Sequence, residues 1–187
     1  MSSRKRIKKR KSRKKLAYVV IAVAFILACF LAYFSLHSSD KTTSPEAVIV
    51  DHLSFLPGQS NQTFVDACKD ILEKGGLTWA YYGGENVTVN FYRKLPSYGT
   101  SLIILRVHSA IMGEAPPLGL FTSERYSVEA AKKYREDVLD GRLVEAFFSP
   151  EEREQGISYF GIVPEFVEKS MKGKFENAII IMMGCDG

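Results

Sequence analysis

Short apolar runs alternate with segments of helical spacing throughout residues 47–187. Apolar runs of this kind are typical of buried strands, whereas apolar positions three and four residues apart indicate amphipathic helices. We expect strands at 47–50, 77–82, 101–107, 120–122, 143–148, 159–163 and 178–183, and helices at 61–74, 127–140, from 150 onward, and at 164–172. Segment 87–95 fits either a short helix or an alternating strand. This order favours an α/β fold with a mostly parallel sheet flanked by helices.

The last strand has the most extreme composition. Residues 178–183 read AIIIMM and include no polar side chain. Strands that are covered on both faces have such continuous apolar sequences. We therefore expect both faces of this strand to be buried.

An uncharged apolar run at residues 16–34 precedes the α/β region. At about 1.5 Å per residue, such a helix spans roughly 28 Å, close to the hydrocarbon thickness of a bilayer. We expect one transmembrane helix at 16–36 that contacts the lipid bilayer. It divides the chain into a basic tail (1–15), the membrane helix (16–36), a linker (37–46) and the α/β domain (47–187).

The charge of the chain is unevenly distributed. Residues 1–15 hold ten Lys or Arg and no acid, whereas the rest hold 25 − 10 = 15 basic and 21 acidic residues. Basic flanks stay cytoplasmic, so we expect a single-pass cell-membrane protein with its C-terminal domain outside the cytoplasm. A cleaved signal peptide and a nucleic-acid-binding arm are the alternatives, but the long apolar run favours an anchor. No basic patch interleaved with aromatic residues follows residue 15, which argues against nucleic acid as a partner.

Several smaller motifs bear on the outer domain. Asn61 and Asn86 begin N-x-Thr sequons and are glycosylation candidates. A disulfide between Cys68 and Cys185 is an open alternative in an oxidising compartment. The histidines and acids lack metal-ligand spacing and no glycine-rich phosphate loop occurs, so we expect neither a metal nor a cofactor.

The two most apolar strands both run into residues that can carry chemistry. Strand 101–107 is followed by His108 and Ser109, and strand 178–183 by Gly184 and Cys185. If these strands are parallel neighbours, the imidazole and the thiol leave the same edge of the sheet. The imidazole could then take the thiol proton, and the amides of Ser109 and Cys185 could face a developing oxyanion.

This constellation resembles the caspase-like (clan CD) cysteine peptidases, which include the CHAT-domain proteins. In that family one core strand ends in His followed by Gly or Ser, and the next ends in a small residue followed by the nucleophilic Cys. The resemblance covers residues 47–187. It implies a caspase–hemoglobinase fold and metal-independent cleavage of peptide bonds. It also implies His108 as general base and acid, Cys185 as nucleophile, and Ser109 and Cys185 as backbone oxyanion donors.

Three departures from the family pattern shape the expectation, and one of them is Ser109 in place of the glycine usual in caspases. His108 and Cys185 are 185 − 108 = 77 residues apart, against roughly 50 in caspases, so we expect an insertion within 111–160. Family members continue beyond the nucleophile, so we expect the domain in 47–187 to be incomplete. The sequence predicts a membrane-anchored, caspase-like cysteine endopeptidase domain that acts on peptide or protein substrates. The alternative is a catalytically inactive, membrane-tethered binding or sensing module of the same fold.

Overall fold

A computed structural model describes residues 44–111 and 118–184 of the chain. Within these ranges, no helix has both the length and the hydrophobicity needed to cross a bilayer. The predicted membrane helix at 16–36 and the basic tail lie outside the described residues, as does Cys185.

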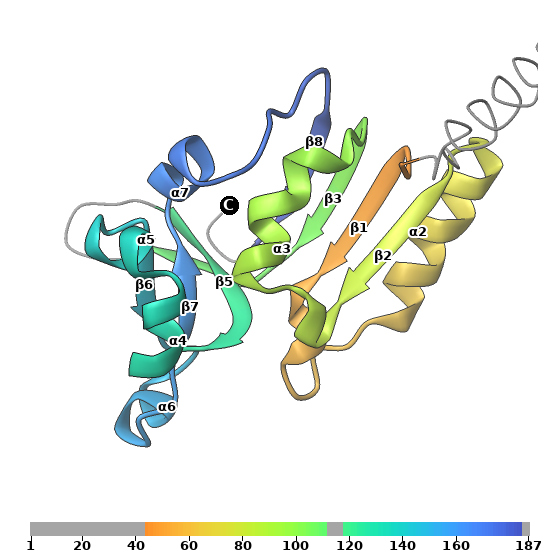
Figure 1. The fold of residues 1–187 in the computed structure, drawn as a ribbon. Helices are drawn as coiled ribbons and strands as arrows, with labels where there is room; N and C mark the ends of the chain where they lie inside the picture. The colour runs from red at the N-terminus through yellow and green to blue at the C-terminus, as the bar shows by residue number, and fades with distance from the viewer. Residues whose placement is uncertain (1–43, 112–117, 185–187) are drawn as a thin grey trace, which may run out of the picture. The chain divides into compact units, whose positions relative to one another are not determined.

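The first sheet contains four parallel strands in the order β2-β1-β3-β8 (Figure 1). Strands β1 (Ala47–Asp51) and β3 (Leu102–Arg106) lie inside it, and β2 (Trp79–Gly83) and β8 (Ile179–Met183) form its edges. Every residue of β1 is buried, as its apolar sequence predicts. The predicted α/β fold with a parallel sheet is therefore confirmed.

Helices cover both faces of this sheet. On one face, α2 (Gln62–Lys74) packs against Ala47 and Ile49, whereas α3 (Val89–Lys94) lies in the core on the other face. The segment whose sequence fitted either a helix or a strand is thus helical. The Thr88 side chain starts α3 by accepting a hydrogen bond from the Phe91 N–H at 3.2 Å.

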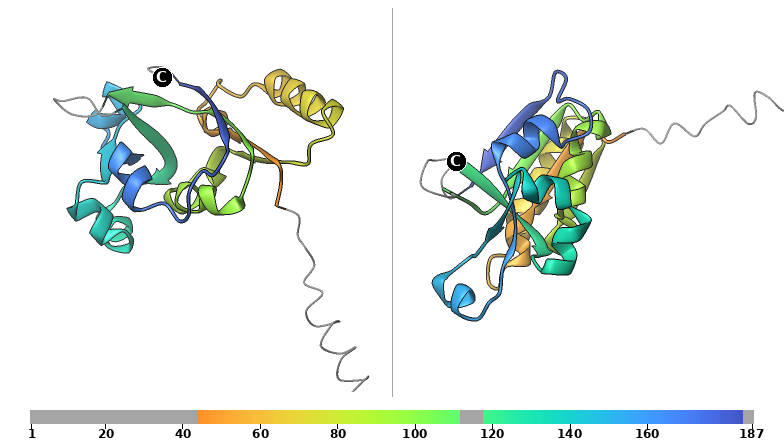
Figure 2. Two further views of the ribbon diagram at one scale, coloured as in Figure 1. Left: turned by 90° about the horizontal axis from the view of Figure 1, so that it is seen from above. Right: turned by 60° about the vertical axis from the view of Figure 1, so that its left-hand side comes forward.

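A second sheet of four antiparallel strands follows β3, in the order β4-β5-β7-β6. Its strands lie within residues 109–162, a range that includes most of the segment 111–160 in which an insertion is expected, and the sequence did not predict a separate sheet. It packs on the face of the first sheet opposite α2 (Figure 2), where Phe160, Ile162 and Ile103 share one core. The elements are β4 (Ser109–Ile111), β5 (Leu118–Arg125), α4 (Val128–Lys133), α5 (Arg135–Leu139), β6 (Leu143–Ala146), α6 (Pro150–Glu154), β7 (Tyr159–Ile162) and α7 (Pro164–Lys169).

Three short 3-10 helices complete the described part of the chain, namely η1 (His52–Phe55), η2 (Gly84–Asn86) and η3 (Leu95–Tyr98). The first of these follows β1 directly. Consequently, η1 begins at the same edge of the sheet at which β3 ends.

Strand β8 contradicts the prediction that both of its faces are buried. All five residues are exposed, from 64% for Ile179 to 37% for Met182. The physical reason is its position at the edge, where it pairs with β3 alone. No described residue of β8 belongs to either of the two apolar cores.

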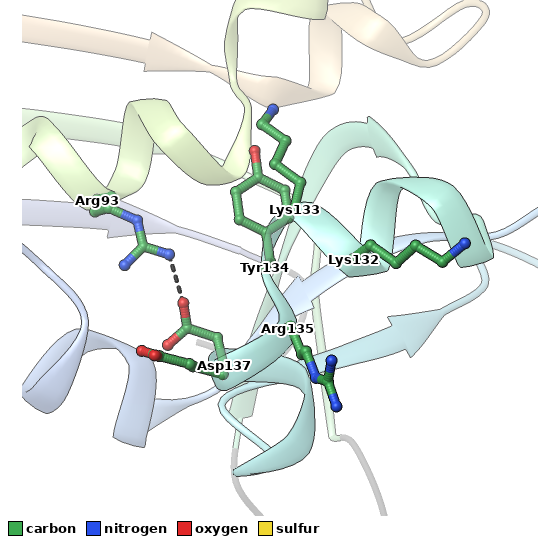
Figure 3. Close-up of a pocket in the computed structure, with 7 residues that line it drawn as sticks. Arg93, Lys132, Lys133, Tyr134, Arg135 and Asp137 are labelled. Atoms are coloured by element: carbon green, nitrogen blue, oxygen red, sulfur yellow. Dashed lines mark hydrogen bonds and ion pairs between the residues drawn. The ribbon is translucent and has the colours of Figure 1, made fainter.

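Asp137 of α5 is a buried carboxylate that joins three elements. It forms ion pairs with Arg93 of α3 at 2.5 Å and with Arg142 at 2.7 Å, and it accepts a hydrogen bond from Ser170 after α7. Figure 3 shows Arg93 reaching Asp137 beside an open pocket. Burial alone would raise the pKa of Asp137, but hydrogen bonds from these three partners outweigh it and hold the pKa below its usual value. The charged carboxylate therefore ties α3 to the second sheet.

We expect Asp137→Asn to lower the free energy of unfolding by about 3 kcal/mol, because it leaves the half-buried guanidinium of Arg93 without a carboxylate and Arg142 with Asp140 alone. Urea unfolding of the full chain, followed by the fluorescence of Trp79, measures this loss. Because the folded pKa of Asp137 lies below its unfolded value, the contribution is present at neutral pH and is lost as the pH falls through the folded pKa.

The matched control is Asp140→Asn. Asp140 pairs with Arg142 at 2.6 Å but its side chain is 58% exposed, so we expect a loss below about 1 kcal/mol. Equal losses in the two variants would contradict the structural role of Asp137.

Candidate active site

The parallel pairing of β3 with β8 positions the candidate site. The register pairs Arg106 with Met183, an offset of 183 − 106 = 77 residues that holds along the whole ladder. One residue further on, the Val107 N–H donates a hydrogen bond to the Met183 carbonyl at 3.0 Å. The two strand ends that carry the predicted residues therefore lie side by side at one edge of the sheet, as the sequence predicted.

Gly184 is the last described residue of this pairing, and it lies directly against Ser109. A Cβ built on Gly184 would stand 2.3 Å from Ser109 Oγ and 3.2 Å from Ser109 Cβ. Only glycine allows the backbone of the β8 end to come this close. The residue before Cys185 is thus in contact with the residue after His108.

Ser109 is fully buried, and its backbone points in a defined direction. It pairs with Leu120 of β5, while the Phe121 N–H donates to the His108 carbonyl at 3.0 Å. In an antiparallel ladder these two facts make Ser109 and Leu120 a non-hydrogen-bonded pair. The Ser109 N–H consequently points away from β5, as an oxyanion donor at this edge would require.

His108 stands against aromatic rings that the second sheet supplies. Its ring centroid lies 4.6 Å from that of Phe121 in β5 and 5.4 Å from that of Phe148, which follows β6. These two phenyl rings stack on each other at 4.7 Å. The second sheet, which lies between β3 and β8 in the chain, therefore forms one wall of the candidate site.

His52 is a second histidine at this edge that the sequence analysis did not assign to the site. It is fully buried, and its Nδ1 accepts a hydrogen bond from the His108 backbone N–H at 3.4 Å. Burial first, and the nearby His108 second, lower the pKa of His52 to about 4, and the Thr122 backbone offsets this only in part. The sequence shows that His52 follows the first strand, but its closeness to His108 comes from the pairing of β1 with β3, which the structure shows.

Asp51, at the end of β1, serves a structural role at the same edge. Its carboxylate is 2.7 Å from Arg106 at the end of β3, and Tyr81 donates to it at 3.4 Å. It also caps η1 by accepting from the Ser54 N–H. Asp51 thus links β1 to both of its neighbouring strands, β2 and β3.

The remaining candidate residues lie away from this edge or outside the description. Cys185, the predicted nucleophile, lies outside the described residues. Cys68 is a free thiol on α2, and burial raises the pKa of this thiol. The alternative of a Cys68–Cys185 disulfide involves a residue outside the described part of the chain and stays a prediction. Asn61 and Asn86 are both exposed. Within 44–111 and 118–184, no group of three His, Cys, Asp or Glu side chains is placed to hold a metal ion.

The contact between Gly184 and Ser109 can be tested by a double-mutant cycle. Gly184→Ala places a methyl group on Ser109 and should lower the free energy of unfolding by about 1–3 kcal/mol. Ser109→Gly removes the atoms that clash, so the double variant should be more stable than the sum of the single effects predicts. Strict additivity in urea unfolding would show that the two residues do not touch.

Comparison with known proteins adds no identification. The chain matches no model of a protein family, no curated protein and no solved structure. Function is therefore inferred from the geometry of the sheet edge.

Proposed function

We propose that residues 47–187 form a caspase-like cysteine endopeptidase domain in which His108 and Cys185 are the catalytic dyad. One observation carries this proposal. The offset of 77 residues that pairs β3 with β8 is also the separation of His108 from Cys185, so a ladder continued by two residues sets them opposite each other. The hydrogen bond from Val107 to Met183 and the contact of Gly184 with Ser109 support that continuation.

The fold proposed is of the caspase–hemoglobinase type. Its support is the strand order β2-β1-β3-β8, with a histidine after β3 and a cysteine after the neighbouring parallel strand. Helices on both faces of this sheet agree with it. Ligands of open parallel sheets bind at the carboxyl ends of the strands, which is where these residues occur.

The proposed chemistry is acyl transfer to sulfur. His108 takes the proton from Cys185, and the sulfur forms a bond with the carbonyl carbon of a substrate peptide. The N–H groups of Ser109 and Cys185 stabilise the oxyanion. When the C–N bond breaks, His108 returns the proton to the leaving amine, and a thioester remains. His108 then takes a proton from water, the hydroxide adds to the thioester, and the acid and the free thiol are released.

A non-catalytic binding module is the second candidate, and β8 favours it. The strand exposes five consecutive apolar side chains at an open sheet edge. Contiguous apolar patches and unprotected edge strands are features of interaction surfaces. On this alternative, Cys185 would be no more reactive than an ordinary thiol.

We further propose that residues 16–36 anchor the domain in the cell membrane, with the N-terminus in the cytoplasm. The uncharged run and the ten preceding basic residues support this orientation. The peptide or protein substrate would then be met outside the cytoplasm. Neither a cofactor nor nucleic acid has a part in the proposed reaction.

The dyad predicts a specific pattern of thiol reactivity. Cys185→Ala should abolish labelling of the full chain by a peptidyl chloromethyl ketone and its hydrolysis of a peptide library, whereas Cys68→Ala should change neither. His108→Ala should slow both by about 10²–10⁴-fold, the range typical of a lost general base. Labelling that persists in Cys185→Ala and disappears in Cys68→Ala would contradict the proposal.

Membrane placement predicts the outcome of proteolysis. Protease added to intact cells should digest the domain and leave the N-terminal tail protected, because the tail lies behind the bilayer. Mass spectrometry of the membrane fraction should find the tail still joined to residues 16–36. A mature chain that lacks residues 1–36 would instead establish a cleaved signal peptide.

A further inference from the structure

The backbone changes partners at His108, where it passes from one sheet to the other. Arg106 is the last residue of β3 and Ser109 is the first of β4. Between them, the His108 carbonyl accepts from the Phe121 N–H, while the His108 N–H donates to Nδ1 of His52. A partly buried backbone N–H is costly to leave without a partner. At His108 the side chain of His52 accepts the hydrogen bond that a carbonyl of a neighbouring strand would accept within a sheet.

The surroundings of His52 hold its ring in one place. The side chain is fully buried, with its ring centroid 5.7 Å from that of Phe148 and 6.2 Å from that of Phe55. Phe148 also contacts the His108 ring, so one phenyl group lies against both imidazoles. His52 and His108 are therefore fixed by the same aromatic packing.

The hydrogen bond requires a neutral imidazole with a defined proton. Nδ1 accepts only when it carries no proton, so the proton of His52 is on Nε2. The lowered pKa of His52, about 4, keeps the ring neutral at pH 7. The same environment that buries the ring therefore maintains its ability to accept.

Stability of the core does little to explain why this residue is a histidine. Nε2 is buried and lacks a hydrogen bond of normal geometry among the described residues, although the Thr122 backbone interacts with the ring and raises its pKa in part. A buried N–H that is poorly paired is destabilising, and an apolar side chain would fill the same space without that cost. The hydrogen bond of normal geometry that this ring makes among the described residues is the one that Nδ1 accepts from the His108 N–H.

We propose that His52 is a positioning residue, which holds the backbone of His108 and so determines where the imidazole of the general base stands. This inference rests on the proposed function and adds to it a residue outside the dyad. Full burial keeps His52 from touching substrate, so it acts only through the His108 N–H. Small displacements of a catalytic group are costly to rate, which makes such support effective.

Two substitutions separate the acceptor from the bulk of the ring. In His52→Asn the side-chain oxygen stands close to the position of Nδ1 and can accept the same N–H. His52→Leu fills the apolar space but accepts nothing. Thermal unfolding of both full-chain variants in detergent micelles establishes that each is folded.

The first readout does not depend on activity. Amide hydrogen exchange of His108, measured by NMR, should be about tenfold faster in His52→Leu than in the unsubstituted chain, whereas His52→Asn should remain within about threefold. The second readout is the rate of Cys185 labelling and peptide hydrolysis at pH 7. It should fall by about tenfold in His52→Leu and be rescued in His52→Asn.

The outcomes distinguish the two proposals. An amide at His108 that exchanges equally in His52→Leu and in the unsubstituted chain overturns the positioning role, even if the chain is an active peptidase. A folded His52→Asn variant in which the His108 amide exchanges as fast as an unprotected amide also overturns the positioning role. If His52→Leu does not fold, this second result is sufficient by itself. The expected exchange pattern in a chain without any reactivity at Cys185 supports the positioning role and overturns the peptidase.

Discussion

The hydrogen-bonded pairing of β3 with β8 is the constraint on which the candidate site depends. These strands are separated by the whole second sheet along the chain, yet their ladder keeps one offset from its first pair to its last. Parallel neighbours deliver the residues that follow them to the same edge. Gly184 extends this closeness past the last ladder pair, because its missing side chain lets the backbone lie on Ser109.

The second sheet contributes to the site as well as to the core. Phe121 and Phe148 pack on His108, and Tyr159 of β7 lies 4.5 Å from Phe148. An aromatic wall of this kind excludes water and strengthens electrostatic interactions beside it. Burial among these rings lowers the pKa of His52, so its imidazole stays neutral beside that of His108. Asp137 and its arginine partners hold the segment between β3 and β8 to α3, away from the site.

The pattern of apolar residues predicted the parallel sheet and its helices, because β1, β3 and α2 bury continuous or periodic apolar faces. A shared edge for the ends of β3 and β8 was expected only if the two strands are parallel neighbours, and their pairing meets that condition. The antiparallel sheet was missed for two reasons. The sequence of β5, LGLFTSER, does not alternate regularly between apolar and polar residues, and β4 spans only three residues. The exposure of β8 could not be predicted, since composition does not reveal whether a strand lies at an edge. His52 was missed because its partner is the backbone of a residue 56 positions away, which no local motif announces.

A disulfide trap tests the shared edge most directly, since it requires no activity. Adjacent strands lie about 4.8 Å apart, which is within the Cα separation that a disulfide spans. In a chain carrying Cys29→Ser and Cys68→Ala, the His108→Cys substitution should yield, on mild oxidation, a cross-link to Cys185 that mass spectrometry of the peptides identifies. Ser101→Cys, at the opposite end of β3, should give none. A folded His108→Cys variant in which both thiols remain free would contradict the account.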